Sequence, residues 1–359
     1  MLTDNDYMER ALLHAERGRG RTSPNPVVGA VVVSDGVVVA TGYHERAGGA
    51  HAEVRALDAA GKRARGATLY STLEPCCHMG RTGPCTERII EAGIRRVVAA
   101  VRDPNPRVAG GGFAALRAGG IDVVDGVLAE AAARANQSFF TWVREARPFV
   151  TMKIALSRDG RVAARPGART AITGPAAGRQ IHRDRAEIDA LGVGVGTVLT
   201  DDPRLTARGS WREHPLSRVI FDRSLRMPPT ARVFSTLKAG PVIVCTLANA
   251  VDGGTAAALQ RAGAQLEGIR EDFLPGALRR LAQLGVTSII LEGGPALHAS
   301  AWHAHLVDRV QLYIGQSLLG VEGVPWLDGA TLPWSALANV GTRWLGGDLL
   351  IEGDVHRTH

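Results

Sequence analysis

Long hydrophobic runs, cysteines and lysines are all scarce in this 359-residue chain. No stretch approaches the roughly 18 apolar residues of a membrane-spanning helix, and the N-terminus, with Asp4, Asp6 and Glu9, lacks the layout of a signal peptide. The chain has four cysteines, three of them between positions 76 and 85, which argues against a disulfide scaffold and favours metal binding in a reducing compartment. We therefore expect a cytoplasmic protein with no membrane partner.

Charge of one sign is not concentrated anywhere in the chain. The net charge is +7, and residues 1–147 carry 19 Lys+Arg against 16 Asp+Glu, so the excess is spread over both halves with no basic tail or block. This distribution argues against a nucleic-acid partner and agrees better with small phosphorylated ligands. Three lysines stand beside 39 arginines, so Lys153 is of interest as a compact ammonium where arginine is the default.

One histidine and two cysteines give the strongest functional signal. The residues are His51, Glu53, Cys76 and Cys85, with Pro75 and Pro84 directly before the cysteines. One histidine and two cysteines are a ligand set for Zn²⁺ that leaves the fourth tetrahedral position open, as in catalytic zinc sites. The glutamate is not needed to hold the metal but can carry protons beside it. The pattern is typical of zinc deaminases acting on amino-substituted pyrimidine and purine rings.

The expected local structure suits these roles. Residues 68–73 read as a strand, and Pro84 suits the first turn of a helix that runs to about Ala92. Cys85 then stands at a helix N-terminus, where free N–H groups and the helix dipole favour a thiolate. His51 opens a second helix, so that in its first turn both His51 and Glu53 can point past the helix end.

Two other interpretations of these residues are possible from the sequence. A lone histidine or cysteine is usually core or surface filler, and Cys77 or His78 could complete a closed structural zinc site. Glu53 argues against the structural site because it would have no role there. The second cysteine follows after eight intervening residues rather than two, and we predict that His78 and Arg81 in this enlarged loop bind an anionic substrate.

The length predicts two domains, 1–147 and 148–359, with the boundary where Pro148 opens new apolar strands. In the first, helices and strands alternate, which predicts a sheet covered by helices on both faces. Its expected helices are 7–17, 51–60, 84–92 and one from 112, and its strands are 29–33, 37–42, 68–73, 96–101 and 121–124.

The second half is also expected to be α/β, with a late antiparallel strand pair. The expected strands are 149–156, 190–195, 219–222, 242–245, 288–292, 309–314 and 349–352, with a helix at 175–186. Gly293 and Gly294 follow a strand and precede a helix, so that turn could receive a phosphate. The glycines at 192, 194 and 196 have the wrong spacing for a dinucleotide fingerprint, and we reject a Rossmann assignment.

Several segments of the first half resemble the deaminase half of the RibD family, the bifunctional proteins of riboflavin biosynthesis. They are residues 24–29 (PNPVVG), 42–44 (GYH), 51–53 (HAE), 73–85 (LEPCCHMGRTGPC) and 103–110 (DPNPRVAG). The resemblance implies a cytidine-deaminase-like three-layer domain in which His51, Cys76 and Cys85 bind zinc and Glu53 carries protons. It further implies that Asn25 and His44 hold the pyrimidine nucleotide, with His78 and Arg81 near its ribose phosphate.

Segments of the second half resemble the reductase half of the same family. They are residues 149–161 (FVTMKIALSRDGR), 196–206 (GTVLTDDPRLT) and 292–294 (EGG). The resemblance implies a dihydrofolate-reductase-like fold that uses NADPH, with Lys153 close to the reacting sugar. The implied cofactor contacts are Ala155, Thr197, Asp201, Gly294, Pro295, Ala296, Leu297, His298, Ala299 and Ser300. The implied substrate contacts are Arg185, Leu205, Arg208 and Glu292.

The chain departs from the family pattern at a few positions. The usual Ser-x-Trp-Ile-Thr segment reads RTAIT at 169–173, and Arg223 stands where the family often has serine. Arg169, Ala171 and Arg223 are therefore not carried over as site residues. Cys77 also replaces a frequent serine, without touching a ligand.

The resemblance implies zinc-dependent hydrolytic deamination of 2,5-diamino-6-(ribosylamino)pyrimidinone 5′-phosphate, followed by NADPH-dependent reduction of the ribosyl chain to ribityl. We expect a small phosphorylated pyrimidine as substrate and a homo-oligomer as the assembly. One alternative is a zinc deaminase whose second domain only binds pyrimidine phosphate or supports assembly. Another is a nucleic-acid base deaminase, which the even charge distribution argues against.

Overall fold

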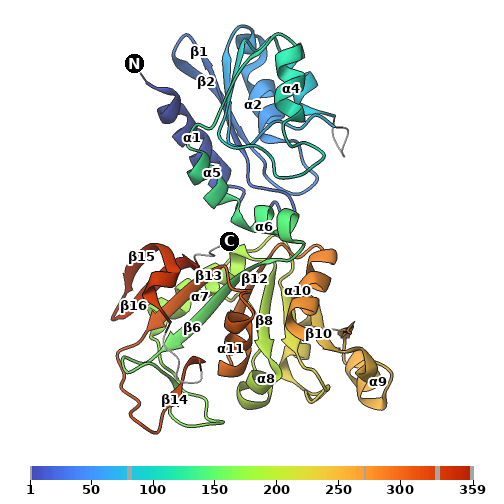
Figure 1. The fold of residues 1–359 in the computed structure, drawn as a ribbon, viewed down its shortest axis with the longest axis vertical. Helices are drawn as coiled ribbons and strands as arrows, with labels where there is room; N and C mark the ends of the chain where they lie inside the picture. Colours follow the sequence, from blue (N-terminus) through green and yellow to red (C-terminus); the bar gives the residue numbers. More distant parts are fainter. Residues whose placement is uncertain (1, 79–82, 271, 328–331, 356–359) are drawn as a thin grey trace. The chain divides into compact units, whose positions relative to one another are not determined.

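The computed structural model describes residues 2–78, 83–270, 272–327 and 332–355. The chain divides into two compact units, Met1–Ala146 and Arg147–His359. Each unit has its own sheet and its own buried core, and each is described by itself below (Figure 1). In the described ranges, no helix is long and apolar enough to cross a membrane.

The first unit is built on a sheet whose strands run in the order β2-β1-β3-β4-β5. Its strands are β1 (Gly29–Ser34), β2 (Val37–Tyr43), β3 (Thr68–Ser71), β4 (Arg96–Ala99) and β5 (Asp122–Asp125). Its helices are α1 (Asp4–Glu16), α2 (Ala52–Ala60), α3 (Cys85–Glu91), α4 (Gly111–Ala118), α5 (Ala129–Ala135) and α6 (Gln137–Glu145), with a 3₁₀ turn at Gly61–Ala64. The β1–β2 and β1–β3 pairs are antiparallel, whereas β3–β4 and β4–β5 are parallel.

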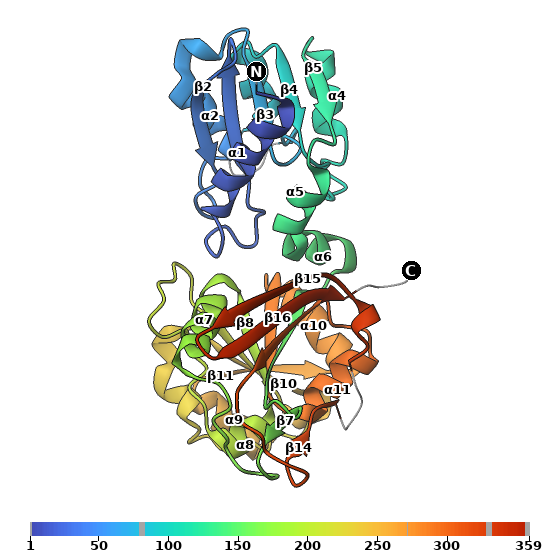
Figure 2. The same cartoon turned by 90° about the vertical axis from the view of Figure 1, so that its left-hand side faces the viewer.

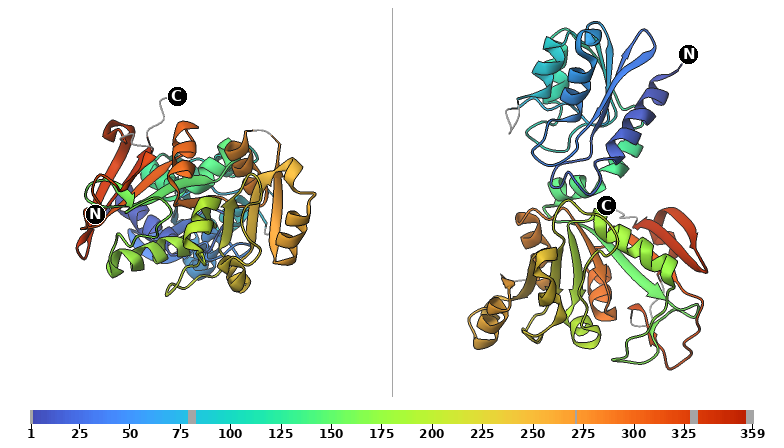
Figure 3. Two further views of the ribbon diagram at one scale, coloured as in Figure 1. Left: turned by 90° about the horizontal axis from the view of Figure 1, so that it is seen from below. Right: turned by 180° about the vertical axis from the view of Figure 1, so that it is seen from behind.

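Helices cover both faces of this sheet, which confirms the predicted three-layer domain. One face packs against α2, α3 and α4 through residues such as Ala56, Ile89 and Leu116. The other packs against α1 and α5 through Met8 and Ala132, and the views of Figures 1 and 3 agree on this division. Glycines let helices approach this sheet closely: a Cβ on Gly29 would lie 1.9 Å from the carbonyl oxygen of Ala11 in α1, and one on Gly42 would lie 2.3 Å from that of Ala52 in α2.

The second unit is built on a larger sheet, with strand order β11-β10-β9-β8-β12-β6-β13-β16-β15 in the described residues. These strands are β6 (Phe149–Leu156), β8 (Ala190–Gly194), β9 (Ser217–Phe221), β10 (Val242–Leu247), β11 (Ala264–Ile269), β12 (Ser288–Glu292), β13 (Arg309–Ile314), β15 (Leu337–Leu345) and β16 (Asp348–Val355). A small separate pair joins β7 (Arg161–Ala163) to β14 (Val324–Pro325). The helices are α7 (Pro175–Glu187), α8 (Val195–Asp201), α9 (Gly254–Arg261), α10 (Phe273–Gln283) and α11 (Pro295–His303), with 3₁₀ turns at Arg232–Ala239, Ala248–Ala250 and Trp334–Ala336.

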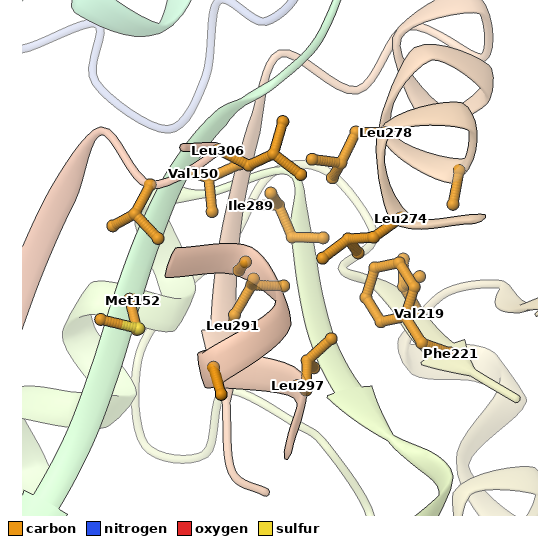
Figure 4. Close-up of a cluster of buried hydrophobic side chains, with 14 of the residues drawn as sticks. Val150, Met152, Val219, Phe221, Leu274, Leu278, Ile289, Leu291, Leu297 and Leu306 are labelled. Carbon is orange, nitrogen blue, oxygen red and sulfur yellow. The ribbon is translucent and has the colours of Figure 1, made fainter. Parts of the chain in front are cut away.

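The strands from β11 to β13 run parallel. β16 pairs antiparallel with β13, which confirms the late antiparallel pair expected between 309–314 and 349–352, and β15 continues the sheet antiparallel to β16. Figure 2 shows the β15–β16 ribbon along this end of the sheet. The largest core cluster packs α10 and α11 on one face of the parallel strands. In Figure 4, Leu278 of α10 and Leu297 of α11 lie over Ile289 and Leu291 of β12.

Several elements of the structure have no counterpart with stated bounds in the sequence analysis. They include the strands β7, β11, β14 and β15 and the helices α5, α6, α8, α9 and α10. No element was placed between residues 124 and 148, but Gln137–Glu145 forms α6, whose Phe140 is buried. β15 was not predicted because its sequence lacks an alternation of hydrophobic and polar residues. This lack is expected of an edge strand whose residues are mostly exposed.

Candidate active sites

His51 and Glu53 stand at the start of α2. The helix begins at Ala52, directly after His51. Gly42 of β2 lets this helix approach the sheet closely, because a Cβ at that position would lie 2.3 Å from the carbonyl oxygen of Ala52. The close packing leaves Glu53 only 3% exposed. Both side chains line the same cavity, as the first-turn argument predicted.

Cys76 and Cys85 flank the loop that leaves the sheet after β3 and returns at α3. The backbone N–H of Thr86 donates to the carbonyl of Cys76 at 3.2 Å, and the N–H of Cys85 donates to Cys76 Sγ at 3.4 Å. These bonds bring the two cysteines together across the intervening residues. Arg81 lies in that interval and outside the described residues, so its contact with a substrate phosphate stays a prediction.

The three predicted zinc ligands lie close together. His51 Nδ1 is 3.2 Å from Cys85 Sγ and 3.5 Å from Cys76 Sγ, and all three ligand atoms lie within 4.8 Å of one another. Of the described residues, neither Cys77 nor His78 belongs to this group, and Cys77 Sγ instead lies 4.0 Å from the carbonyl of Arg107. One imidazole and two thiols at this spacing fit a single tetrahedral Zn²⁺ with an open fourth position.

The electrostatics of the cluster favour a thiolate at Cys76. The hydrogen bond from Cys85 and that from His51 outweigh burial and lower the pKa of Cys76 to about 4. The same hydrogen bond and burial raise the pKa of Cys85. The expected thiolate at Cys85, at the start of α3, stays a prediction for the zinc-bound site. Burial also raises the pKa of Glu53, whose Oε1 accepts a hydrogen bond from Ser71 Oγ at 3.1 Å.

A cavity of about 410 Å³ opens beside the cluster. The predicted substrate residues Asn25, His44 and His78 line it together with His51 and Glu53. Asn25 Nδ2 lies 3.1 Å from His44 Nε2, and His44 Nδ1 lies 3.2 Å from the carbonyl oxygen of Ala50. Because a carbonyl only accepts, Nδ1 carries the proton and Nε2 accepts from the amide of Asn25. Burial lowers the pKa of His44, in keeping with a neutral ring.

Sequence reasoning missed several residues that line this cavity. They are Glu74, Asp103, Asn105, Phe139 and Trp142. Glu74 accepts four backbone hydrogen bonds, from residues 103, 110, 112 and 113, and so holds the loop after β4 in place. Burial raises the pKa of Asp103 to about 6. The aromatic residues belong to α6, which the sequence did not predict, although their spacing of three is a helical signal.

In the second unit, Lys153 and Glu292 are neighbours because β6 and β12 pair in register, with Glu292 opposite Lys153. Arg185 reaches the same carboxylate from α7. It donates from Nε to Oε1 at 2.8 Å and from Nη2 to Oε2 at 2.6 Å, while Lys153 Nζ lies 3.9 Å from Oε2. Between 11% and 14% of each of these three side chains is exposed.

This buried triad sets the charge states of its members. Burial opposes ionisation of Glu292, but the charges of Arg185 and Lys153 more than offset it and lower the pKa of Glu292 to about 2. Burial lowers the pKa of Lys153, against the charge of Glu292. Tyr313 lies beneath the ammonium, 5.4 Å from Nζ to the ring centre, and its hydroxyl donates to Asp184 at 2.5 Å. A carboxylate held by two hydrogen bonds from Arg185 and a buried ammonium thus stand side by side.

The predicted glycine turn follows directly after Glu292. Gly293 and Gly294 have φ values of 85° and 80°, which favour glycine, and α11 begins at Pro295. A Cβ on Gly293 would lie 3.0 Å from Thr197 Oγ1. The turn therefore places an uncovered glycine backbone and the N-terminus of α11 next to Thr197. Such an arrangement can bind phosphate oxygens.

A cavity of about 830 Å³ joins these features. The predicted residues that line it are Lys153, Ala155, Arg185, Thr197, Asp201, Leu205, Arg208, Glu292, Gly294, Pro295 and Ala296. Leu297, His298, Ala299 and Ser300 do not line it, and the first three are buried, so contact of these four with a cofactor stays a prediction. The segment not carried over from the family pattern, including Arg169 and Ala171, lines the cavity as well.

The chain was compared with protein families, curated proteins and solved structures. Residues 148–351 match the RibD C-terminal domain, and residues 1–101 match the cytidine and deoxycytidylate deaminase zinc-binding region. The riboflavin biosynthesis protein RibD of Aquifex aeolicus is 42% identical over 321 residues, which covers 89% of both chains. The chain belongs to the RibD family.

Further relatives agree with this RibD assignment. The Escherichia coli RibD is 39% identical over 330 residues, covering 89% of this chain and 90% of that one. The structure of Acinetobacter baumannii RibD matches with a TM-score of 0.88, 34% identity and 99% coverage of both chains. A Thermotoga maritima diaminohydroxyphosphoribosylaminopyrimidine deaminase/5-amino-6-(5-phosphoribosylamino)uracil reductase matches with a TM-score of 0.85, 35% identity and coverage of 98% and 99%.

As a RibD protein, the chain is a bifunctional deaminase and reductase of riboflavin biosynthesis. Its first domain has the cytidine deaminase fold, and its second has the dihydrofolate-reductase-like fold of the RibD reductases. Its cofactors are zinc and NADPH.

Proposed function

We propose that residues 1–147 carry the deaminase activity and that His51, Cys76 and Cys85 hold its zinc. The observation that supports this most strongly is the group of three donor atoms within 4.8 Å of one another at the wall of a cavity. When bound, Zn²⁺ is the Lewis acid that activates the hydrolytic water. The lack of a fourth ligand among the described residues favours this catalytic role over a structural one.

Glu53 is proposed to carry protons in the deamination. Its side chain is buried at the cavity wall, with Oε2 3.7 Å from Cys85 Sγ and Oε1 within hydrogen-bond distance of Ser71. Burial favours the protonated form of Glu53, so the side chain can take up a proton and pass it to the ring and to the departing ammonia. Ser71 Oγ also lies 2.8 Å from the carbonyl oxygen of Leu73. A hydroxyl has one proton, so when Ser71 donates to this carbonyl, its oxygen accepts the hydrogen bond that protonated Glu53 donates.

Asn25 and His44 are proposed to recognise the pyrimidine ring. Since the amide nitrogen of Asn25 donates to His44, its oxygen is turned to the other side, where it accepts no hydrogen bond from a described residue and is available to an amino group of the ring. His78 lines the same cavity, and its buried Nδ1 has no partner among the described residues. A polar atom of this kind is suited to a phosphate or sugar oxygen of the substrate.

Residues 148–359 are proposed to carry the reductase activity, with Lys153 as its catalytic residue. When bound, NADPH supplies the hydride. Glu292 is held ionised and can accept hydrogen bonds from sugar hydroxyls, with Arg185 fixing its orientation. Burial eases proton release from Lys153, which suits proton donation to the sugar oxygen. The glycine turn and Thr197 would meet the cofactor.

The substrate is proposed to be 2,5-diamino-6-(ribosylamino)pyrimidinone 5′-phosphate, and the assembly to be a homo-oligomer. The cavity volumes of about 410 and 830 Å³ suit a nucleotide-sized molecule in the first site and a nucleotide with a cofactor in the second. A second domain that only binds pyrimidine phosphate is disfavoured by the buried Lys153–Glu292–Arg185 triad, which gives it reactive groups.

The substitution Glu53→Gln tests the deaminase assignment. It keeps the size of the side chain and removes the titrating group, so zinc content by atomic absorption should remain one per chain while ammonia release falls by about 10²–10⁴-fold. Glu87→Gln is the matched control, because Glu87 is exposed in the first turn of α3. Normal ammonia release by Glu53→Gln, or loss of zinc from it, would contradict the assigned role.

A further inference from the structure

Besides Arg185 of the buried triad, five arginines line the reductase cavity. Three of them, Arg169, Arg204 and Arg208, are here called the arginine cluster. Among the described residues, the ion pairs in this cavity join Lys153 and Arg185 to Glu292, and no member of the arginine cluster takes part in them. No ion pair at contact distance joins a member of the cluster to a carboxylate of the described residues, and Asp201, on which the charge of Arg169 acts, lines the same cavity.

The members of the arginine cluster lie within electrostatic reach of one another. Burial and then the charges of Arg185, Arg204 and Arg169 lower the pKa of Arg208. Arg169 also acts on Asp201, where its charge opposes the rise in pKa that burial causes. Like charges gathered at a cavity wall repel one another, and an anion bound among them relieves that repulsion.

The cluster stands next to the proposed sugar-binding groups. Arg185 Nη1 donates to the carbonyl of Thr206 at 3.0 Å, and the backbone N–H of Arg208 lies 3.2 Å from His182 Nδ1. These bonds tie residues 206–208 to α7, from which Arg185 reaches Glu292. A sugar bound at Glu292 would thus have its far end near the cluster, whereas the glycine turn at α11 offers the cofactor phosphates a separate place.

Arg169 is the member that distinguishes this chain. In the RibD pattern the segment at 169–173 usually begins with serine and has an aromatic two residues later, but here it reads RTAIT. A guanidinium in this place adds a full charge and a planar fork of donors that matches two phosphate oxygens. A serine hydroxyl offers a single neutral donor.

We propose that Arg169 and Arg204 join Arg208 in binding the 5′-phosphate of the pyrimidine substrate in the reductase cavity. This inference rests on the proposed reductase function and adds its phosphate-recognition residues. Affinity at this site then depends on an arginine at position 169, and discrimination between phosphorylated and dephosphorylated substrate comes from the cluster.

The test uses the full chain, the deaminated phosphorylated substrate and its dephosphorylated counterpart. Arg169→Ala should raise KM for the phosphorylated compound by about tenfold to a hundredfold, the range for a lost charge-assisted contact. The kcat should change less than twofold, and KM for the dephosphorylated compound should not change. Arg169→Lys should recover part of the loss because it restores the charge without the fork. Arg183→Ala is the matched control, since Arg183 is exposed on α7 and does not line the cavity.

Three results would overturn the proposal. The first is an unchanged KM in Arg169→Ala and in the double variant Arg169→Ala/Arg204→Ala. The second is an equal rise for both compounds. The third is an unchanged substrate KM together with lost preference for NADPH over NADH, which would assign the cluster to the cofactor's 2′-phosphate.

Calorimetric binding of the phosphorylated compound without NADPH gives a readout that does not need turnover. In Arg169→Ala, we expect weaker binding at the reductase site and unchanged binding at the deaminase site, which serves as the internal reference. Unchanged affinity at both sites in Arg169→Ala would overturn the proposal, even if the chain oxidises no NADPH. Absence of NADPH oxidation by the wild type would instead refute the reductase assignment.

Discussion

The substitution Glu292→Gln is expected to destabilise the reductase domain by about 3 kcal/mol at pH 7. Glu292 faces two cations, Arg185 and Lys153, in a site that is 11–14% exposed. The pKa of Glu292 is lowered from 4.5 to about 2, and at about 1.36 kcal/mol per unit this corresponds to roughly 3 kcal/mol of stability. Removal of one partner from a buried ion pair leads to a similar figure, about 3–5 kcal/mol.

The pH dependence has a definite sign. Because the folded-state pKa of Glu292 lies below its usual 4.5, the stabilisation is fully present above that pH and is lost as pH falls towards about 2. Glu292→Gln removes both the stabilisation and this acid-side loss. The variant should therefore differ most from wild type near neutral pH and least near pH 2.

Urea unfolding followed by tryptophan fluorescence measures the effect. Five of the six tryptophans lie in residues 147–359, so the signal reports mainly on the reductase domain. The free energy of unfolding falls by about 1–3 kcal/mol per molar urea, so a loss of about 3 kcal/mol lowers the urea concentration at the unfolding midpoint by about 1–3 M. Glu267→Gln is the control, because its pair with the 43%-exposed Arg280 should contribute less than about 1 kcal/mol. A Glu292→Gln shift no larger than that of the control would refute the reasoning.

Two further stability predictions follow from buried polar groups. His298 is fully buried, and burial lowers its pKa from 6.5 to about 4. The free energy of unfolding of wild type should therefore fall by roughly 3 kcal/mol as pH falls from 6.5 to 4. Urea unfolding of His298→Gln should lack this decline, and parallel pH profiles of the two proteins would contradict the prediction. The side chain of Asn136 accepts from the N–H of Val27 at 2.8 Å and donates to its carbonyl at 2.9 Å. Asn136→Ala should therefore destabilise the deaminase domain by about 1–3 kcal/mol or more, measured by calorimetry. An unchanged thermal unfolding transition would show that these hydrogen bonds contribute nothing.

Much of the fold was predictable because its central strands and helices carry strong local signals. The β1–β2 hairpin around residues 34–36 and the α2 and α3 starts follow from turn residues, proline placement and apolar runs. By contrast, β15 depends on tertiary context, because it is held by pairing with β16 rather than by a core of its own. α6 was missed although Phe139 and Trp142, three residues apart, are a helical signal in its sequence.

The candidate sites divide in the same way. The zinc ligands are predictable since few residue types bind zinc and their order along the chain is informative. The roles of Glu74 and Asp103 are not, because a carboxylate that holds a loop and one that lines a cavity look alike in sequence. The Arg185–Glu292 pair joins residues 107 positions apart, and their contact is set by the sheet order.

The most direct test of two active sites in one chain is NADPH oxidation, followed by absorbance with two starting compounds. With the diamino compound, wild type should oxidise NADPH only after ammonia is released, and Glu53→Gln should oxidise it about 10²–10⁴-fold more slowly. With the deaminated compound, Glu53→Gln should match wild type, whereas Lys153→Ala should release ammonia from the diamino compound normally but oxidise no NADPH. Oxidation of NADPH at the wild-type rate by Glu53→Gln with the diamino compound, or undiminished oxidation by Lys153→Ala, would contradict the account.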